Sequence, residues 1–446
     1  MKRGLCAALF LALLGGLLTG CGESVTPAPT TTTATSTTTA ATTATSAEAT
    51  TTTDTESTTT QTEGSDMTTT TTASTAAPTT KPQTYTSTTT TKATTTKATT
   101  TTLAAITTAD PYEVALTDAR LHYEGRTAVE GGSVLLDWTG AGVTMQVQGG
   151  DVRVKLTSSH SASSSNAPCF AVYVNGRRKK TLTANATVVW HTLATGLPTN
   201  KYTTISIVKL SEAMFSTATL QAIELTGALG PKPALPDRKM LILGDSITCG
   251  WGTKTEGADA PFTTATEDGS LTYGWLLADR LNAQKHILSV SGNGLATSNT
   301  GSTTSALLPQ QLPFVHFEAD YSGPQWDADQ YQPDLILVNL GSNDVFAGSP
   351  ADRLKNGVKS LCATLRESYP AATIVWVYGL MTAGQESTIR LAVEEVAETD
   401  AKVHYLYVDT DSMKETGSGY HPNELGHARA ADELEPQIRE IMGWDD

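Results

Sequence analysis

The hydrophobic pattern of residues 237–446 alternates between two kinds of segment. Short apolar runs are followed by longer stretches whose apolar positions recur every three or four residues. The short runs predict buried strands, and the longer stretches predict amphipathic helices. The expected strands are Met240–Leu243, His286–Val290, Leu335–Leu340, Thr373–Tyr378 and Val403–Val408, and the expected helices are Leu271–Leu281, Ala351–Ser368, Glu386–Glu398 and Pro422 to about Met442. This order predicts an α/β fold with a five-stranded parallel sheet that helices cover on both faces.

Residues 111–230 follow a different pattern, in which apolar and polar positions mostly alternate. A period of two predicts half-buried strands. Turns rich in Gly, Asn and Ser separate the expected strands, which are Ser133–Asp137, Val143–Val147, Val152–Leu156, Phe170–Val174, Thr187–Leu193, Thr203–Val208 and Thr219–Leu225. Short strands at regular spacing predict a β-sandwich, jelly-roll-like in type. Residues 231–236 then form a short Pro-rich hinge before the α/β domain at 237–446.

Residues 22–110 show no hydrophobic period. From Thr30 to Thr108, 43 of 79 positions are threonine, and large apolar residues are almost absent. Such a composition cannot bury enough apolar surface to fold. We therefore expect a disordered linker between the N-terminus and the β-sandwich.

The first 21 residues have the form of an export signal. Lys2 and Arg3 precede an apolar run, Leu5 to Leu18, that is short for a membrane span and leads to Cys21. The segment resembles a bacterial lipoprotein signal, which implies cleavage before Cys21 and lipid attachment to that cysteine. An ordinary secretory leader with a chance cysteine is the alternative. Both predict export, and lipidation would hold the protein at the outer face of the bacterial cell membrane.

Charge and cysteine content exclude several classes of partner. Residues 237–446 hold 14 Lys/Arg and 30 Asp/Glu, so this half carries −16, and the whole chain carries −15. Nucleic acid binding needs clustered cations, so no nucleic acid partner is expected. The basic run Arg177–Lys180 is interpreted as a solvated turn after a strand. Cys169, Cys249 and Cys362 form no CxxC pair, so neither a disulfide framework nor a zinc site is indicated.

Four short blocks place reactive side chains at the ends of elements. They are Gly244-Asp245-Ser246 after the first strand, Ser291-Gly292-Asn293-Gly294 after the second, Gly341-Ser342-Asn343-Asp344 after the third, and Tyr420-His421 before the last helix. In parallel sheets, ligands bind at the carboxyl ends of the strands. We therefore expect Ser246, Gly292, Asn343 and His421 to surround one cleft, with Asp245 and Asp344 bracing loops.

These residue types suit acyl transfer. A serine hydroxyl becomes a nucleophile when a neutral imidazole accepts its proton, which gives Ser246 and His421 as the catalytic pair. The tetrahedral intermediate carries an oxyanion that needs preorganised donors. The N–H groups of Ser246 and Gly292, with the side-chain amide of Asn343, are the candidate oxyanion hole. Gly294 is the alternative to Gly292 in this role.

The four blocks resemble the SGNH (GDSL-type) hydrolases, which carry Ser, Gly, Asn and His in this order on a flavodoxin-like sheet. With the β-sandwich in front, the segments Gly244–Gly252 and Leu197–Glu212 are similar to carbohydrate esterase family two, the acetyl xylan esterase-like enzymes. The resemblance implies removal of O-acetyl groups from plant cell-wall polysaccharides such as xylan or mannan. It implies no metal and no organic cofactor. The Gly-x-Ser-x-Gly pattern of the other large hydrolase class is absent around Ser246.

One position departs from the SGNH pattern. Most members place an aspartate three residues before the histidine, whereas this chain has Ser418 there. The resemblance then implies a Ser246–His421 dyad, with a main-chain carbonyl in place of the acid. Asp409 or Asp411 could instead complete a triad.

Aromatic residues suggest how a sugar could bind. Trp251, Trp326 and Tyr420 are candidates for stacking on sugar rings at the cleft, and packing is the alternative for each. Two other functions stay open: a lipase, thioesterase or arylesterase of the same fold, and a non-catalytic carbohydrate-binding surface protein. We expect a monomer that acts on acetylated polysaccharide and meets the membrane only through its lipid anchor.

Overall fold

The computed structural model describes residues 104, 110–409 and 415–445. Cys21, the threonine-rich segment and Asp411 lie outside this part of the chain. The β-sandwich and the α/β part belong to one compact unit. Within the described residues, no helix combines the length and the apolar character that crossing a membrane requires.

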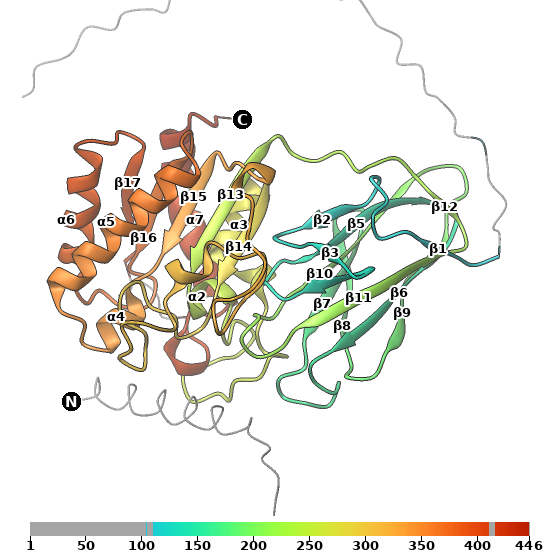
Figure 1. Ribbon diagram of the computed structural model, residues 1–446, viewed down its shortest axis with the longest axis horizontal. Helices are drawn as coiled ribbons and strands as arrows, with labels where there is room; N and C mark the ends of the chain where they lie inside the picture. Colours follow the sequence, from blue (N-terminus) through green and yellow to red (C-terminus); the bar gives the residue numbers. More distant parts are fainter. Residues whose placement is uncertain (1–103, 105–109, 410–414, 446) are drawn as a thin grey trace, which may run out of the picture. The chain divides into compact units, whose positions relative to one another are not determined.

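The N-terminal part is a β-sandwich of two antiparallel sheets (Figure 1). One sheet has the order β3-β4-β11-β6-β9 with β1 paired to β11, and the other has the order β12-β5-β10-β7-β8 with β2 paired to β5. Burial alternates along β6, as the period-two pattern predicts. The strands are β1 Tyr112–Val114, β2 His122–Glu124, β3 Val129–Glu130, β4 Ser133–Leu136, β5 Gly142–Gln148, β6 Gly150–Ser158, β7 Cys169–Val174, β8 Arg177–Thr183, β9 Val189–Leu197, β10 Thr203–Lys209, β11 Ala218–Leu225 and β12 Ala228–Leu229. The predicted sandwich is confirmed.

The interpretation of the basic run as a solvated turn is wrong. Arg177–Lys180 begins strand β8, which lies at the edge of its sheet and pairs with β7. Charged side chains suit an edge strand because they discourage further pairing. One of them also has a specific partner: Arg178 Nη1 lies 2.7 Å from Oδ2 of the fully buried Asp268 in the α/β part.

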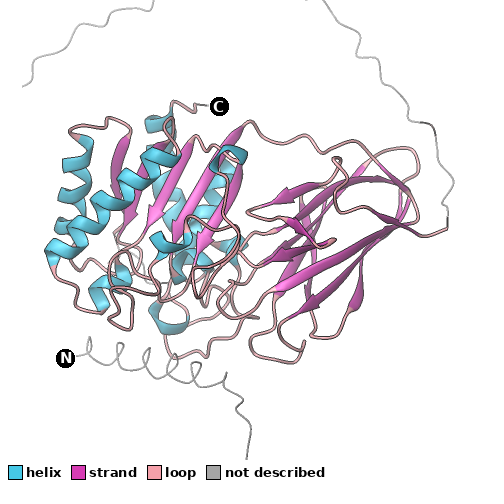
Figure 2. Cartoon of the chain, viewed as in Figure 1, coloured by secondary structure: helices cyan, strands magenta, loops and turns pink. Residues whose placement is uncertain are grey.

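The C-terminal part is a doubly wound α/β fold whose five strands run parallel in the order β14-β13-β15-β16-β17. Figure 2 shows helices around this sheet. The elements are β13 Arg238–Gly244, α2 Ser246–Cys249, η1 Gly269–Leu271, α3 Tyr273–Arg280, β14 Ala283–Ser289, η2 Leu308–Gln311, η3 Ala328–Gln330, β15 Leu335–Asn339, α4 Ser342–Phe346, α5 Ala351–Ser368, β16 Thr373–Tyr378, α6 Glu386–Ala397, β17 Val403–Tyr407, η5 Ser418–Tyr420 and α7 Glu424–Met442. The predicted five-stranded, flavodoxin-like sheet is confirmed.

The two faces of this sheet bury different apolar clusters. Leu241 and Leu243 of β13 pack in a cluster with residues of α5 and α6. Met240 and Ile242 of the same strand pack in a second cluster with residues of α3 and α7. Because both faces are covered, every residue of β15 is buried, which explains why all of its residues except Asn339 at the carboxyl end are apolar.

The last helix begins later than expected. The side chain of Asn423 accepts hydrogen bonds from the N–H groups of Leu425 and Gly426, both at 3.1 Å, so α7 starts at Glu424 and not at Pro422. An Asn cap satisfies N–H groups that have no partner inside the helix. His421 therefore lies in extended backbone ahead of the helix.

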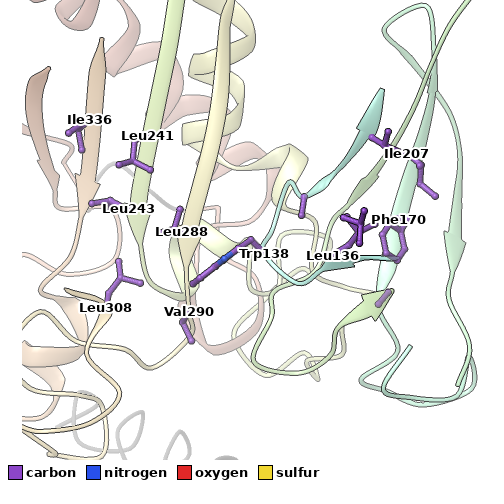
Figure 3. Close-up of a cluster of buried hydrophobic side chains, with 14 of the residues drawn as sticks. Leu136, Trp138, Phe170, Ile207, Leu241, Leu243, Leu288, Val290, Leu308 and Ile336 are labelled. Atoms are coloured by element: carbon purple, nitrogen blue, oxygen red, sulfur yellow. The ribbon is translucent and has the colours of Figure 1, made fainter. Parts of the chain in front are cut away.

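The cores of the β-sandwich and the α/β part are continuous. One buried cluster includes Leu136 and Trp138 from the sandwich together with Leu288 and Val290 from the α/β part (Figure 3). The Trp138 indole N–H donates to the carbonyl of Val315 at 2.8 Å. The sandwich thus supports loops of the α/β part directly.

Candidate active site

Ser246 and His421 are in direct contact. Ser246 is the first residue of α2, immediately after β13, and Asp245 caps that helix by accepting from the Ile247 N–H at 3.0 Å. The Ser246 Oγ lies 2.7 Å from Nε2 of His421, and both residues are buried. Two residues 175 positions apart are thereby brought within hydrogen-bonding distance, as the sequence predicts.

The other ring nitrogen of His421 fixes its tautomer. Nδ1 lies 3.1 Å from the carbonyl oxygen of Ser418, the position where most SGNH enzymes have an aspartate. A carbonyl only accepts, so Nδ1 carries the hydrogen and Nε2 is left to accept from Ser246. Burial lowers the pKa of His421 to about 4, so the imidazole is neutral at pH 7.

The Gly292 position needs glycine. Its φ is +77°, and a Cβ there would lie 2.9 Å from Nδ2 of Asn299. An L side chain would be strained in this region and would also clash. Among the described residues no acceptor engages the Gly292 N–H. Ser246, as the first helical residue, likewise has no intrahelical acceptor for its N–H.

Asn343 is buried beside these donors, but its amide is already engaged. Nδ2 donates to Oδ2 of Asp245 at 3.1 Å and to the carbonyl of Asn293 at 2.9 Å. An amide has two N–H donors, so Asn343 must release one of these bonds to bind an oxyanion. The neighbouring Asn293 has a buried Nδ2 that finds no partner within the described residues, and it is a donor that the sequence pattern does not single out.

Asp245 and Asp344 hold loops around the site, as expected. The Asp344 carboxylate accepts hydrogen bonds from the N–H groups of Leu295, Ala296 and Thr297 at 2.6–2.8 Å. These bonds fix the loop that follows Gly292. Burial raises the pKa of Asp245 to about 7.

Trp251 does not form an exposed platform for sugar. Its exposed fraction is 6%, and its ring stacks on Phe262 with centroids 3.5 Å apart. Its centroid is 5.6 Å from that of His421, and Phe215 from the β-sandwich packs at 5.7 Å. Trp251, Phe262 and Phe215 therefore form an apolar wall next to the imidazole. The contributions of Phe215 and Phe262 could not be read from the sequence, because their contact with Trp251 arises only in the folded chain.

The other two aromatic candidates differ in exposure. Trp326 is half-buried, with the Arg126 guanidinium 4.9 Å from its ring centroid and the His286 ring 5.8 Å away in an edge-on contact. These contacts favour packing for Trp326. Tyr420 directly precedes His421, has a φ of +64° and is 52% exposed. Tyr420 is therefore an exposed aromatic residue directly beside the Ser246–His421 pair.

Comparisons with known proteins agree with this geometry. The GDSL-like Lipase/Acylhydrolase family matches residues 242–429, and the Carbohydrate esterase 2 N-terminal family matches residues 123–233. An acetylxylan esterase / glucomannan deacetylase from Cellvibrio japonicus is 30% identical over 348 residues, which cover 75% of this chain and 92% of that protein. The chain belongs to carbohydrate esterase family two. It is therefore a carboxylic ester hydrolase.

Solved structures of family-two esterases have the same fold. The enzyme from Cellvibrio japonicus is 28% identical with a TM-score of 0.69, over 75% of this chain and 99% of that one. A family-two esterase from Clostridium thermocellum in complex with cellohexaose is 25% identical with a TM-score of 0.66, over 73% of this chain and 99% of that one. The likeness therefore extends over nearly the whole length of each of these two structures.

A buried acidic cluster lies near the esterase site. Ligand atoms of Glu212, Cys249 and Glu267 lie within 4.8 Å of one another, and all three residues are fully buried. The spacing could accommodate a cation. However, both carboxylate oxygens of Glu212 already accept hydrogen bonds from Ser291, and the buried Lys209 ammonium donates to the Glu212 carbonyl at 2.9 Å. The Glu212 carboxylate is therefore engaged by groups of the protein itself.

The lowered pKa of His421 predicts an unusual pH profile. Only neutral imidazole can accept the Ser246 proton, so kcat/KM should fall as the pH drops through the histidine pKa. With that pKa at about 4, the enzyme should keep full kcat/KM at pH 5.5. An unshifted histidine, with a pKa of roughly 6.5, would have lost about 90% of its neutral form there.

The measurement is kcat/KM for 4-nitrophenyl acetate between pH 3.5 and 8. An acid limb centred at pH 6 or above that persists in an Asp245→Asn variant would contradict the prediction. A second inflection of kcat/KM near pH 7 would indicate titration of Asp245, and an Asp245→Asn variant should remove that inflection.

Proposed function

We propose that this family-two esterase removes O-acetyl groups from plant cell-wall polysaccharide such as xylan or mannan, with Ser246 as nucleophile and His421 as general base. The 2.7 Å contact between Ser246 Oγ and His421 Nε2 carries the proposal. The activity in the name of the Cellvibrio japonicus relative, deacetylation of xylan and glucomannan, supports the choice of substrate.

The geometry supports a two-step transfer. The Ser246 Oγ attacks the acetyl carbonyl carbon while its proton passes to His421 Nε2. The oxyanion of the tetrahedral intermediate accepts from the N–H groups of Ser246 and Gly292, and from Asn343 once it releases a bond. The C–O bond to the sugar then breaks, and the sugar oxygen takes the proton from His421. Water repeats the sequence on the acetyl-enzyme, which releases acetate and restores Ser246.

We further propose that the pair works as a dyad. The Ser418 carbonyl accepts from Nδ1 of His421 at 3.1 Å, and it can therefore hold the ring in the productive tautomer. Asp409 is exposed, and Asp411 lies outside the described residues.

The dyad predicts that neither aspartate is essential. Asp409→Asn and Asp411→Asn should each leave kcat within about tenfold of the original enzyme, since tenfold corresponds to only ~1.4 kcal/mol of barrier. The measurement is kcat for acetate release at pH 7 by each single variant and by the double variant. A loss of about 10³-fold or more in any of them would indicate a triad.

Polysaccharide would lie over the mouth of this site. We propose that the exposed Tyr420 ring stacks on a sugar next to the acetylated one. The Clostridium thermocellum esterase with bound cellohexaose supports a sugar chain as the ligand of this fold.

The substrate is tested by parallel release of acetate. Acetylated xylan, acetylated glucomannan and acetylated peptidoglycan are incubated with the enzyme and with Ser246→Ala as control. Acetate from xylan or glucomannan supports the proposal, whereas release from peptidoglycan alone contradicts it. 4-Nitrophenyl esters of two to twelve carbons test the alternative activities, because a lipase or long-chain thioesterase would prefer the longer chains.

We propose that the enzyme is exported and anchored through lipid on Cys21. The prediction is that Cys21→Ala moves the protein from the membrane fraction to the soluble fraction, because one or more acyl chains supply the anchoring energy. Immunoblots of fractionated cells measure this, with Cys249→Ala as a matched cysteine control that should stay with the membranes. Equal membrane retention of Cys21→Ala and the original protein, with the apolar run Leu5 to Leu18 shown to be cleaved from both, would exclude a lipid anchor at this residue.

A further inference from the structure

One carboxylate of the β-sandwich, that of Glu212, contacts the loop of the α/β part that carries Gly292. Glu212 lies in the loop after β10 and is fully buried. Its Oε2 accepts a hydrogen bond from the Ser291 N–H at 2.7 Å, and its Oε1 accepts a second from the Ser291 hydroxyl. Ser291 immediately precedes Gly292, whose N–H is the proposed oxyanion donor. A residue of the sandwich therefore holds the backbone on which that donor lies.

The loop that carries Glu212 is itself anchored. Lys209 is fully buried, and its ammonium donates to the carbonyls of Asp137, Ser211 and Glu212 at 2.8, 2.5 and 2.9 Å. The Glu212 N–H donates to Oε2 of Glu267 at 3.0 Å. The main chain of Glu212 is thus held at its carbonyl by Lys209 and at its N–H by Glu267, while Ser291 holds the side chain.

Glu212 and Glu267 form a buried pair of carboxyl groups. Burial raises the pKa of Glu267 well above its ordinary value. Burial also raises the pKa of Glu212, and the two hydrogen bonds from Ser291 oppose this change.

Resting on the function proposed above, we propose that Glu212 is a positioning residue of the esterase: it fixes the Gly292 N–H in the oxyanion hole through its paired hydrogen bonds to Ser291. The β-sandwich is then part of the catalytic apparatus and does not serve only as a binding or spacer module. Precise placement matters because oxyanion donors act through geometry set before the reaction. A displacement of about 1 Å can cost roughly 10²-fold in rate.

Two variants separate the length of the Glu212 side chain from its chemical type. Glu212→Asp keeps the carboxyl group but shortens the side chain, so Ser291 must move or lose its acceptors. Glu212→Gln keeps the length: its oxygen can accept from the Ser291 N–H, and its NH₂ can donate to the Ser291 hydroxyl. We expect kcat to fall about 10- to 100-fold in Glu212→Asp, with KM changed less than about threefold, and to stay within about threefold in Glu212→Gln.

Glu124→Gln is the matched control. Glu124 is also a carboxylate of the sandwich; it accepts from the Thr144 hydroxyl at 2.8 Å and pairs with His122, and none of these contacts involves Ser291 or Lys209. This variant should lower the melting temperature and leave kcat unchanged. All kcat values are normalised to the fraction of Ser246 that a fluorophosphonate probe labels, so partly unfolded protein does not count.

The outcomes distinguish this inference from the proposed function. If Glu212→Asp has the wild-type kcat per labelled site, or if Glu212→Gln loses as much as Glu212→Asp, positioning by Glu212 is refuted. If the original enzyme releases no acetate yet reacts with the probe, the proposed function fails. The rates of probe labelling in the three variants then still test the role of Glu212, because phosphonylation of Ser246 also develops negative charge in the oxyanion hole. No reaction with either reagent refutes both.

Discussion

Replacing Ser246 with alanine is expected to lower kcat for acetate release by about 10⁴-fold or more, which corresponds to about 5.5 kcal/mol of barrier. The variant has no nucleophile, so only the oxyanion donors and substrate binding remain to assist attack by water. Ser246 is buried and its hydroxyl donates to His421, so the loss of the side chain removes the attacking atom without opening the fold. The measurement is acetate release from acetylated xylan under conditions of excess substrate.

Thr248→Ala is the control for Ser246→Ala. Thr248 lies on the same helix, is also buried, and its hydroxyl bonds to the Tyr273 hydroxyl at 3.0 Å. It should lose about 1–2 kcal/mol of stability, the usual effect of removing a buried hydrogen bond, and keep its kcat. More than 1% of wild-type kcat in Ser246→Ala would mean that another group attacks the ester. Polysaccharide binding that persists in Ser246→Ala, together with an inactive wild type, would favour the non-catalytic binding protein.

Much of the α/β part could be predicted from the sequence, because the hydrophobic pattern of each of its elements fits either a helix or a strand and not both. Helix α5 and strand β16 have the bounds that the sequence pattern predicts, Ala351–Ser368 and Thr373–Tyr378. A strand buried on both faces must be apolar throughout, and a helix on such a sheet must carry an apolar stripe. Each signal is local, so one sequence suffices to read it.

The elements that the sequence pattern did not predict are those with few buried side chains. Strand β8 is polar and lies at a sheet edge, so nothing in its pattern of residues distinguishes it from a turn. Its one decisive contact, between Arg178 and Asp268, joins residues 90 positions apart. Long-range pairs of this kind depend on the packing of two domains, and the sequence of either segment alone does not specify them.

The site shows the same division between local and long-range information. The four blocks could be recognised because each combines an element end with a reactive residue type. The engagement of the Asn343 amide by Asp245 and Asn293, and the contact of Glu212 with Ser291, arise only when separate loops meet. Residue type predicts which groups can react. Which hydrogen bonds these groups already form can be known only from the folded structure.

Replacing His421 with alanine is expected to lower kcat by about 10³- to 10⁴-fold, because the Ser246 proton then has no acceptor at 2.7 Å. The reduction should be slightly smaller than for Ser246→Ala, since the hydroxyl can still attack when water removes its proton. Activity of the variant should rise with pH, as hydroxide replaces the imidazole. Added imidazole should restore part of the rate, because the deleted ring leaves a cavity next to Ser246.

His427→Ala is the matched control for this prediction. His427 is fully buried on α7, and its Nδ1 accepts from the Tyr273 N–H at 3.3 Å, so its ring contributes to packing. The control should lose stability but keep kcat and show no response to imidazole. A His421→Ala enzyme that retains more than a tenth of wild-type kcat would show that Ser246 is deprotonated by another group. The 2.7 Å contact would then be structural, and the case for a Ser246–His421 dyad would fail with it.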